Sequence, residues 1–235
     1  MHIENFKKYM TAELLMGPNS ARILEALWKK HPLSLTADDM ILDLGCGKGL
    51  TSLLIAKETS AKVYATDLWI SAEDNEKRFA EWGLNGQVVP VHADANTLPF
   101  AERIFQAMVS VDAYHYFGTK PEFFNNNILP FLANRAELLI GVPGIKEEYR
   151  GRSDELLSAW LQNDACLFQS PTAWREIIGK HDRIATVETW EMDCFDLAWN
   201  EWFATEHPYS LGDKQFFETL IQPYTCFVGI YSKLN

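Results

Sequence analysis

The residues with the clearest chemical meaning lie between positions 41 and 51, which read Ile-Leu-Asp-Leu-Gly-Cys-Gly-Lys-Gly-Leu-Thr. A short apolar strand is followed there by glycines at positions 45, 47 and 49, and then by the start of a helix. Glycine lets a turn fold tightly and lets a ligand approach the backbone, and the first turn of a helix offers unpaired N–H groups. In an open α/β sheet this arrangement predicts a site for a nucleotide-like ligand at the carboxyl end of the strands.

Three acidic residues discriminate between the ligands that such a turn can hold. Asp43 stands just before the glycines, Asp67 ends the next apolar segment, and Asp94 follows the third one. A carboxylate at position 43 repels a pyrophosphate but suits a ligand that carries an ammonium group and a sulfonium. Asp67 can accept hydrogen bonds from both ribose hydroxyls, and Asp94 can accept one from an adenine amino group. Leu50 occupies the place of the third glycine of the dinucleotide fingerprint, so the pattern favours S-adenosylmethionine over a dinucleotide.

At segments 43–49, 66–69 and 92–100 the chain resembles the class I S-adenosylmethionine-dependent methyltransferases. The resemblance covers about residues 38–145. Within the family, the chain is similar to the branch of small-molecule and lipid-precursor methyltransferases that includes cyclopropane-fatty-acid-synthase-like proteins. The resemblance implies S-adenosylmethionine as the cofactor, bound by Asp43, Gly45, Cys46, Gly47, Gly49, Asp67, Leu68, Trp69, Asp94, Ala95 and Asp112.

The resemblance also implies a role for each part of this cofactor site. The glycine turn and Cys46 line the methionine part, Asp67 holds the ribose, and the two residues after it flank the adenine. Asp94 and Ala95 face the adenine edge, and Asp112 lies near the methionyl and sulfonium end.

Apolar strands and amphipathic helices alternate along the chain from position 40 onwards. The strands are predicted at 40–44, 62–66, 88–92, 107–111, 137–142, 184–188 and 224–232, and the helices at 50–59, 71–82, 121–132 and 171–180. Short apolar, β-branched strands are typical of a buried parallel sheet, and their alternation with helices indicates a doubly wound α/β fold. The resemblance implies a Rossmann-like sheet of seven mostly parallel strands with an antiparallel last strand.

One methyltransferase domain is expected over residues 1–235, with its cofactor-binding core at 40–143. Residues 1–39 look mostly helical and are expected to form a lid. Segments 144–170 and 190–223 exceed the minimal α/β pattern, and long ordered insertions often form binding loops or lids. We therefore expect them to form a helical cap over the substrate site.

The turn Gly17-Pro18-Asn19 interrupts the N-terminal helical pattern. Two interpretations stay open for it. It either folds the N-terminal segment over the cofactor, with Met16 aimed inward, or simply connects two helices.

The methyl acceptor is expected to meet the cofactor at the loop after the fourth strand, where His115 and Tyr116 are the predicted catalytic residues. Histidine has an unperturbed pKa suited to proton transfer near neutrality, and the tyrosine can orient a substrate. The alternative is that both side chains only pack the lip of the sheet. Residues 111–116 also lack the Asp/Asn-Pro-Pro-Tyr/Phe sequence typical of methyltransferases that act on bases, which disfavours a nucleic-acid acceptor.

Residues 190–207 combine five acids with five aromatic residues and contain no lysine or arginine. Aromatic faces beside carboxylates attract organic cations, so one hypothesis is that this segment binds an amine that is methylated on nitrogen. The alternative is that Phe195, Trp199, Trp202 and Phe203, spaced i, i+4, i+7 and i+8, form a helix face that packs on the core.

The overall composition limits the remaining function classes. Acidic residues outnumber basic ones by 32 to 21, which gives a net charge of -11 and disfavours a nucleic-acid partner. We expect a small-molecule substrate, no stable membrane insertion and no metal, because no apolar run spans a bilayer and the four cysteines form no C-x-x-C pair. Scattered cysteines and the lack of an N-terminal apolar core favour a cytoplasmic protein. The sequence contains nothing that defines the oligomeric state.

Three other functions stay open beside methyl transfer to a small molecule. The chain can be a non-catalytic regulator that binds S-adenosylmethionine, or an enzyme that builds a cyclopropane on a lipid. An NAD(P)-dependent oxidoreductase is disfavoured by the glycine spacing and by Asp43.

Overall fold

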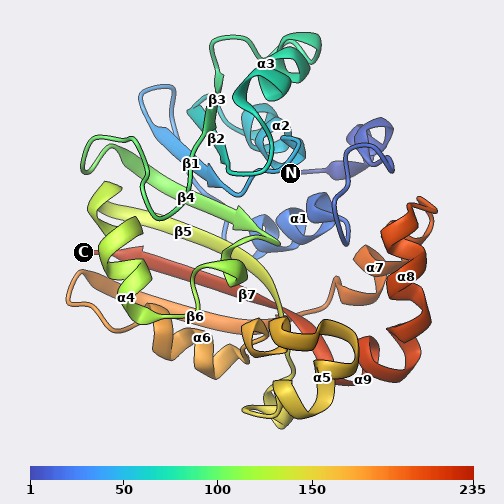
Figure 1. Ribbon diagram of the computed structural model, residues 1–235. Coiled ribbons are helices and arrows are strands. Elements are labelled where there is room, and N and C mark those ends of the chain that lie inside the picture. The colour runs from blue at the N-terminus through green and yellow to red at the C-terminus, as the bar shows by residue number, and fades with distance from the viewer.

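The computed structural model describes residues 1–235 and contains one seven-stranded sheet with the strand order β3-β2-β1-β4-β5-β7-β6 (Figure 1). The strands are β1 Met40–Leu44, β2 Lys62–Asp67, β3 Val88–His92, β4 Phe105–Val111, β5 Leu132–Ile145, β6 Ile184–Met192 and β7 Thr225–Leu234. The pairs among β1 to β5 are parallel, and β7 runs antiparallel to both β5 and β6. The predicted Rossmann-like fold class with an antiparallel last strand is therefore confirmed.

Helices cover both faces of this sheet. They are α1 Ser20–Lys30, α2 Leu50–Glu58, α3 Ala72–Glu81, α4 Pro121–Phe123, α5 Ser153–Leu161, α6 Pro171–Ile178, α7 Phe195–Phe203, α8 Pro208–Phe216 and α9 Gln222–Tyr224. None of them is long and apolar enough to cross a membrane.

The two faces of the sheet carry separate hydrophobic cores, because successive residues of a strand point to opposite sides. Ile41 belongs to the core formed with α1, α2 and α7, whereas Leu42 belongs to the core formed with α6. The sheet is therefore buried on both faces. The place left for a ligand is the edge formed by the carboxyl ends of the parallel strands.

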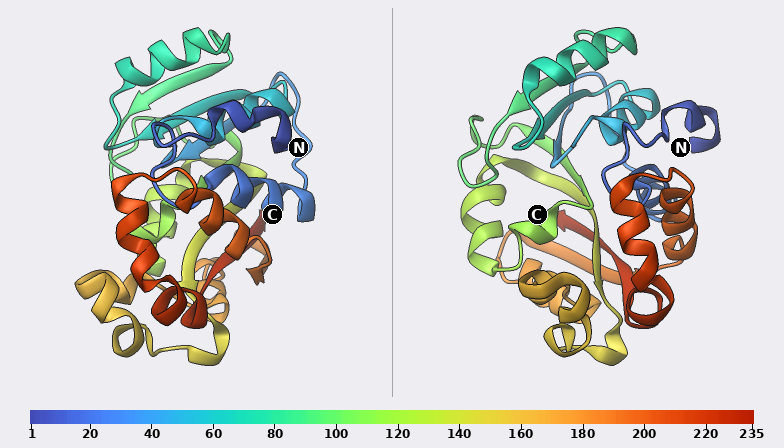
Figure 2. Two further views of the ribbon diagram at one scale, coloured as in Figure 1. Left: turned by 90° about the vertical axis from the view of Figure 1, so that its right-hand side faces the viewer. Right: turned by 45° about the vertical axis from the view of Figure 1, so that its right-hand side comes forward.

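The N-terminal segment and helices α7 and α8 lie at this edge. Figure 1 shows them on the side toward which β4 points, and Figure 2 (left) turns that side to the viewer. The N-terminal segment contains a 3₁₀ helix, Ile3–Tyr9, and continues as an irregular chain to α1.

Three predicted elements differ from the structure, and the first is the strand expected at 137–142, which extends over Leu132–Ile145 as β5. The helix expected at 121–132 is irregular: α4 is followed by a π-helical turn, Phe124–Ile128, and a 3₁₀ turn, Leu129–Phe131. Three consecutive asparagines have low helix propensity, and Pro130 has no N–H to continue an α-helix. The insertion expected from position 190 starts later, because Trp190 lies within β6 and pairs with Gly229 of β7.

Candidate functional site

The glycine turn connects β1 to α2 and packs against the neighbouring strand ends. Gly45, Gly47 and Gly49 all have positive φ, at 74°, 53° and 84°, a region that side chains rarely adopt. A Cβ at Gly45 would lie 2.3 Å from the Cβ of Ala113, in the loop after β4. The Gly45 N–H donates to the Thr66 carbonyl of β2 at 2.8 Å. The turn is therefore held tightly between the ends of two strands, with its backbone toward the open edge.

Asp43 lies beneath this turn and not in the open space above it. Its Oδ2 accepts hydrogen bonds from the hydroxyls of Thr51 at 2.7 Å and Ser52 at 2.6 Å, both in α2. The side chain is fully buried, and Oδ1 has no hydrogen-bond partner. Burial raises the pKa of Asp43 to about 6, although the two hydroxyls oppose this shift. Asp43 thus ties the strand before the turn to the helix after it.

Asp67 orders the loops on the other side of the turn. Its Oδ2 accepts the Gly47 N–H at 2.8 Å, and its Oδ1 accepts the N–H groups of Trp69 and Ile70 at 2.8 and 2.9 Å. Asp94 follows β3, and hydrogen bonds from the backbone and side chain of Asn96 lower its pKa. Both carboxylates keep lone pairs that a ligand can use.

A cavity of about 330 Å³ lies above the turn, at the carboxyl ends of β1, β2 and β4. The predicted site residues in its wall are Gly45, Cys46, Gly47, Asp67, Leu68, Trp69, Asp94, Ala95, Asp112 and Tyr116. Asp43, Gly49 and His115 are not in the wall. Gly49 instead precedes α2, where a Cβ would lie 2.4 Å from the ring of Phe79.

Asp112 directly follows β4 and brings a carboxyl group to the cavity wall. It is half-buried, has a left-handed φ of 56°, and its side chain makes no hydrogen bond or ion pair with another residue. Burial raises its pKa to about 7, and the negative charge of Asp213 in α8 adds to the shift. At neutral pH this carboxyl group can therefore both accept and release a proton.

Tyr116 forms an aromatic wall beside Asp112. About half of its side chain is exposed, and its ring meets that of Trp69 edge-on at 5.4 Å between centroids. Burial of the phenol, with the charge of Asp112, raises its pKa to about 12. The phenol thus stays protonated and acts as a hydrogen-bond donor.

His115 points away from the cavity, although it is next to Tyr116 in sequence. Its side chain is buried, its Nδ1 has no partner, and its ring packs against Tyr116 and Phe168 with centroids 4.0 and 6.1 Å away. Burial lowers the pKa of His115 to about 3, so the imidazole stays neutral at physiological pH. This placement favours the packing interpretation over the predicted role as a base.

The N-terminal segment supplies residues of the wall that sequence reasoning left open. Leu14, Met16, Gly17 and Pro18 line the cavity, and a Cβ at Gly47 would lie 3.1 Å from the Met16 sulfur. Of the two interpretations of the Gly17-Pro18-Asn19 turn, the structure favours the lid with Met16 aimed inward. The sequence feature that indicated this lid is the Gly17-Pro18-Asn19 turn, because a rigid turn fixes the direction of the chain before it.

The aromatic segment after β6 does not form a cation site at the cavity. Trp199, Trp202 and Phe203 are buried in the core, as the spacing i, i+3, i+4 of a packed helix face requires. Neither insertion contributes a residue to the cavity wall. The second insertion acts on the cavity only through the charge of Asp213, which raises the pKa of Asp112. Asp213 accepts hydrogen bonds from the indoles of Trp160 at 3.1 Å and Trp202 at 3.4 Å. Nothing in the spacing around Asp213 indicates that its charge acts on Asp112.

The chemistry of this wall fits S-adenosylmethionine. The turn leaves only backbone where the amino-acid part of this ligand has to lie. Asp67 and Asp94 can accept hydrogen bonds from hydroxyl and amino groups. Asp112 adds a carboxyl group that pairs with no cation of the protein. Apolar and aromatic side chains, Leu68 and Trp69, are 49% and 66% exposed beside Asp67. Exposed large apolar groups at a cavity mouth are typical of a ligand-binding surface.

Sequence comparison places the same residues in a known family. Residues 41–129 match the family described as methyltransferase domain. Human mitochondrial arginine-hydroxylase NDUFAF5 is 35% identical over 82 residues, which make up 35% of this chain and 22% of that protein. The match therefore spans about a fifth of the length of this relative.

Solved structures share the fold over nearly the whole chain. Geranyl diphosphate C-methyltransferase from Streptomyces coelicolor A3(2), in complex with Mg²⁺, geranyl diphosphate and S-adenosyl-L-homocysteine, has a TM-score of 0.73 at 17% identity. That alignment covers 91% of this chain and 78% of the other. Phosphoethanolamine N-methyltransferase 2 of Haemonchus contortus, in complex with S-adenosyl-L-methionine, has a TM-score of 0.70 at 17% identity, over 94% and 54% of the two chains.

At these identities the solved structures establish the fold, and the match over residues 41–129 establishes the kind of domain. Residues 41–129 therefore match a methyltransferase domain, and the chain as a whole shares the fold of solved methyltransferases that bind S-adenosyl-L-methionine or S-adenosyl-L-homocysteine.

Proposed function

We propose that this protein transfers a methyl group from S-adenosylmethionine to a small-molecule acceptor. The observation that carries the proposal is the single cavity in which the glycine turn, Asp67, Asp94 and Asp112 meet. The solved relatives named above act on small molecules according to their names, which supports the same acceptor class here.

Each part of the cofactor has a matching group in the proposed arrangement. The turn from Gly45 to Gly47 holds the methionine part through backbone groups, and Asp67 accepts from the ribose hydroxyls with the lone pairs that its three N–H bonds leave free. Trp69 and Leu68 flank the adenine, and Asp94 faces its edge. When bound, the cofactor supplies a methyl group activated by a positive sulfur.

An amine is the acceptor that the wall around Asp112 supports best. The carboxylate has no cation partner, and a positive ligand relieves its repulsion with Asp213. A protonated amine has no lone pair for methylation, so a base has to remove a proton first. Asp112, with a pKa of about 7, can take that proton, while the neutral phenol of Tyr116 and the ring of Trp69 enclose the acceptor.

Calorimetry and turnover together test this function. We expect S-adenosylhomocysteine to bind the purified protein, and a panel of amines, phenols, carboxylates and thiols to release S-adenosylhomocysteine from S-adenosylmethionine only with amines. Turnover confined to another class would overturn the amine proposal. Binding without turnover on any acceptor would indicate a regulator, and absence of binding would overturn the whole proposal. Glu73→Gln, on the exposed face of α3, is a matched control that leaves both readouts unchanged.

The broader setting follows from the same proposal. We propose one domain over residues 1–235 that acts without a nucleic-acid partner, since the net charge of -11 opposes binding to phosphates. All four cysteines are unpaired, which supports the reducing cytoplasm as the compartment.

A further inference from the structure

The N-terminal segment, residues 1–19, crosses the cavity but is fastened to the molecule on either side of it. At its start the terminal amino group pairs with Glu58 of α2 at 2.6 Å. At its end the Asn19 N–H donates to the Ala198 carbonyl of α7 at 3.1 Å. Between these points, the Lys48 ammonium donates to the Glu13 carbonyl. The part that lines the cavity is thus a strap whose position depends on its two ends.

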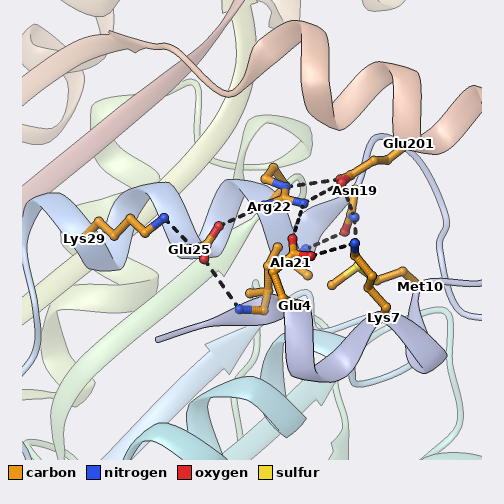
Figure 3. Close-up of polar contacts among 10 residues, drawn as sticks. Glu4, Lys7, Met10, Asn19, Ala21, Arg22, Glu25, Lys29 and Glu201 are labelled. Carbon is orange, nitrogen blue, oxygen red and sulfur yellow. Dashed lines mark hydrogen bonds and ion pairs between the residues drawn. The ribbon is translucent and has the colours of Figure 1, made fainter.

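Arg22 and Glu201 form the centre of the fastening at the α7 end (Figure 3). The guanidinium Nη2 lies 2.5 Å from Oε1 of Glu201, and Nε lies 3.3 Å from Oε2. This two-point geometry gives an Arg–carboxylate pair direction as well as energy. The Arg22 side chain is 13% exposed and that of Glu201 is 25% exposed, so water screens the pair only in part.

Asn19 connects this ion pair directly to the strap. Its amide nitrogen donates to the same Oε2 of Glu201 at 2.7 Å, and its Oδ1 accepts the Ala21 N–H at 3.0 Å as the N-cap of α1. Asn19 is fully buried, and Gly17, two residues earlier, lies against Asp112 in the cavity wall. Glu201 of α7 therefore holds the buried side chain of Asn19, and Asn19 in turn fixes the place of Gly17 in the cavity wall.

Two further acids share the guanidinium. Arg22 pairs with Glu25 at 3.1 Å and with Glu4 of the 3₁₀ helix at 3.2 Å (Figure 3). Removal of the Glu201 charge therefore leaves Arg22 paired, whereas removal of Arg22 leaves the buried carboxylate of Glu25 with an exposed lysine as its only ion-pair partner. Glu201 is for this reason the residue whose substitution tests the fastening with least damage to the fold.

We propose that Arg22 and Glu201 are positioning residues, which latch the N-terminal strap over the cofactor cavity and so set how long the cofactor stays bound. The inference rests on the proposed function, because it assumes S-adenosylmethionine in that cavity. In the latched state Gly17 and Met16 close the wall beside Asp112 and Gly47. Unlatching lets the strap lift from its α7 end, while its start stays held by Glu58.

The test is the dissociation rate of S-adenosylhomocysteine, measured by stopped-flow with the fluorescence of Trp69 and its neighbours. Glu201→Gln keeps the shape of the side chain and an acceptor for Asn19 but removes the charge. We expect its dissociation rate to rise at least fivefold, with a smaller change in the midpoint of thermal unfolding. Glu155→Gln, which breaks the exposed pair with Arg152, is the matched control and keeps the wild-type rate.

A second measurement separates the latch from the proposed function, since it needs no ligand. A glutamate-specific protease cleaves after Glu13, which is exposed in the part of the strap that lifts, and we expect that cleavage to be at least fivefold faster in Glu201→Gln than in the wild type or the control variant. Equal cleavage and equal dissociation rates in Glu201→Gln and wild type would overturn the latch. Faster cleavage in a protein that binds no S-adenosylhomocysteine would overturn the proposed function and retain the movable strap.

Discussion

Gly17 lies directly against the carboxylate of Asp112. A Cβ at position 17 would lie 2.8 Å from Asp112 Oδ2, closer than real Cβ contacts. The N-terminal strap and the loop after β4 therefore meet at one point, and this contact closes the cofactor cavity on the side of the proposed acceptor. It also explains why a residue without a side chain precedes Pro18.

The variant Gly17→Ala tests the importance of this contact. The added methyl group has to displace either the Asp112 carboxylate or the strap, so we expect the dissociation constant for S-adenosylhomocysteine to rise about tenfold, equivalent to about 1.4 kcal/mol. Isothermal titration calorimetry measures it. Gly212→Ala is the control, because a Cβ there meets nothing within 4 Å. Equal affinity in Gly17→Ala and wild type would show that the strap does not touch the ligand site.

Asp67→Asn tests the carboxylate that orders the cofactor loops. An amide nitrogen would face at least one of the three backbone N–H donors that Asp67 now accepts, and an unsatisfied donor costs about 1–3 kcal/mol. We expect a lower free energy of unfolding and at least tenfold weaker binding of S-adenosylhomocysteine, measured by urea unfolding and calorimetry. Asp38→Asn, at an exposed position, serves as control. Unchanged affinity in Asp67→Asn would remove this residue from the cofactor site.

The pH dependence of methyl transfer follows from Asp112. The carboxylate form is needed to hold a cationic acceptor and to accept its proton, and the pKa of Asp112 is about 7. We therefore expect kcat/KM for an amine to rise with pH through about 7, and the rise to disappear in Asp112→Asn together with most of the activity. A wild-type profile that is flat from pH 6 to 8 would contradict this role.

Asp112→Asn is expected to raise the free energy of unfolding although it lowers the activity. The folded-state pKa of Asp112 is raised from 3.8 to about 7, so its contribution to stability is present below pH 3.8 and is lost as the pH rises through 7. Asp112→Asn removes this loss, and we expect it to gain stability relative to wild type between pH 4.5 and pH 8 in urea unfolding. Asp43 has a shift of the same sign but is present in both proteins and cancels in the comparison. A stability difference that is independent of pH would contradict the raised pKa.

His115→Gln separates packing from proton transfer at the neighbouring position. The buried imidazole has a pKa lowered to about 3 and does not line the cavity, so we expect the rise of kcat/KM near pH 7 to persist in this variant. The free energy of unfolding should fall, because Gln cannot restore the ring contacts with Tyr116 and Phe168. Loss of the pH-dependent rise in His115→Gln, but not in Asp112→Asn, would make His115 the base.

Local patterns identified most of the predicted residues that line the cavity without a structure. A strand, a glycine turn and a helix are adjacent in sequence, so their arrangement depends on short-range backbone geometry. The acids after the second and third strands reach the same edge because parallel strands end together, and the structure has Asp67 and Asp94 in one cavity wall. The expected helix at 121–132 is irregular because Pro130 prevents a regular hydrogen-bond pattern.

The sequence by itself determined the fold class, the match of residues 41–129 to a methyltransferase domain, and the end of the sheet where the cavity lies, because each depends on periodicity and spacing within short segments. Only the tertiary structure decided which side chains face the cavity. Asp43 points to the helix-covered face because successive strand residues alternate, whereas contacts between segments far apart in the chain bring Gly17 to Asp112 and fasten Asn19 to Glu201. Such long-range contacts depend on the packing of the whole molecule, which no local pattern encodes.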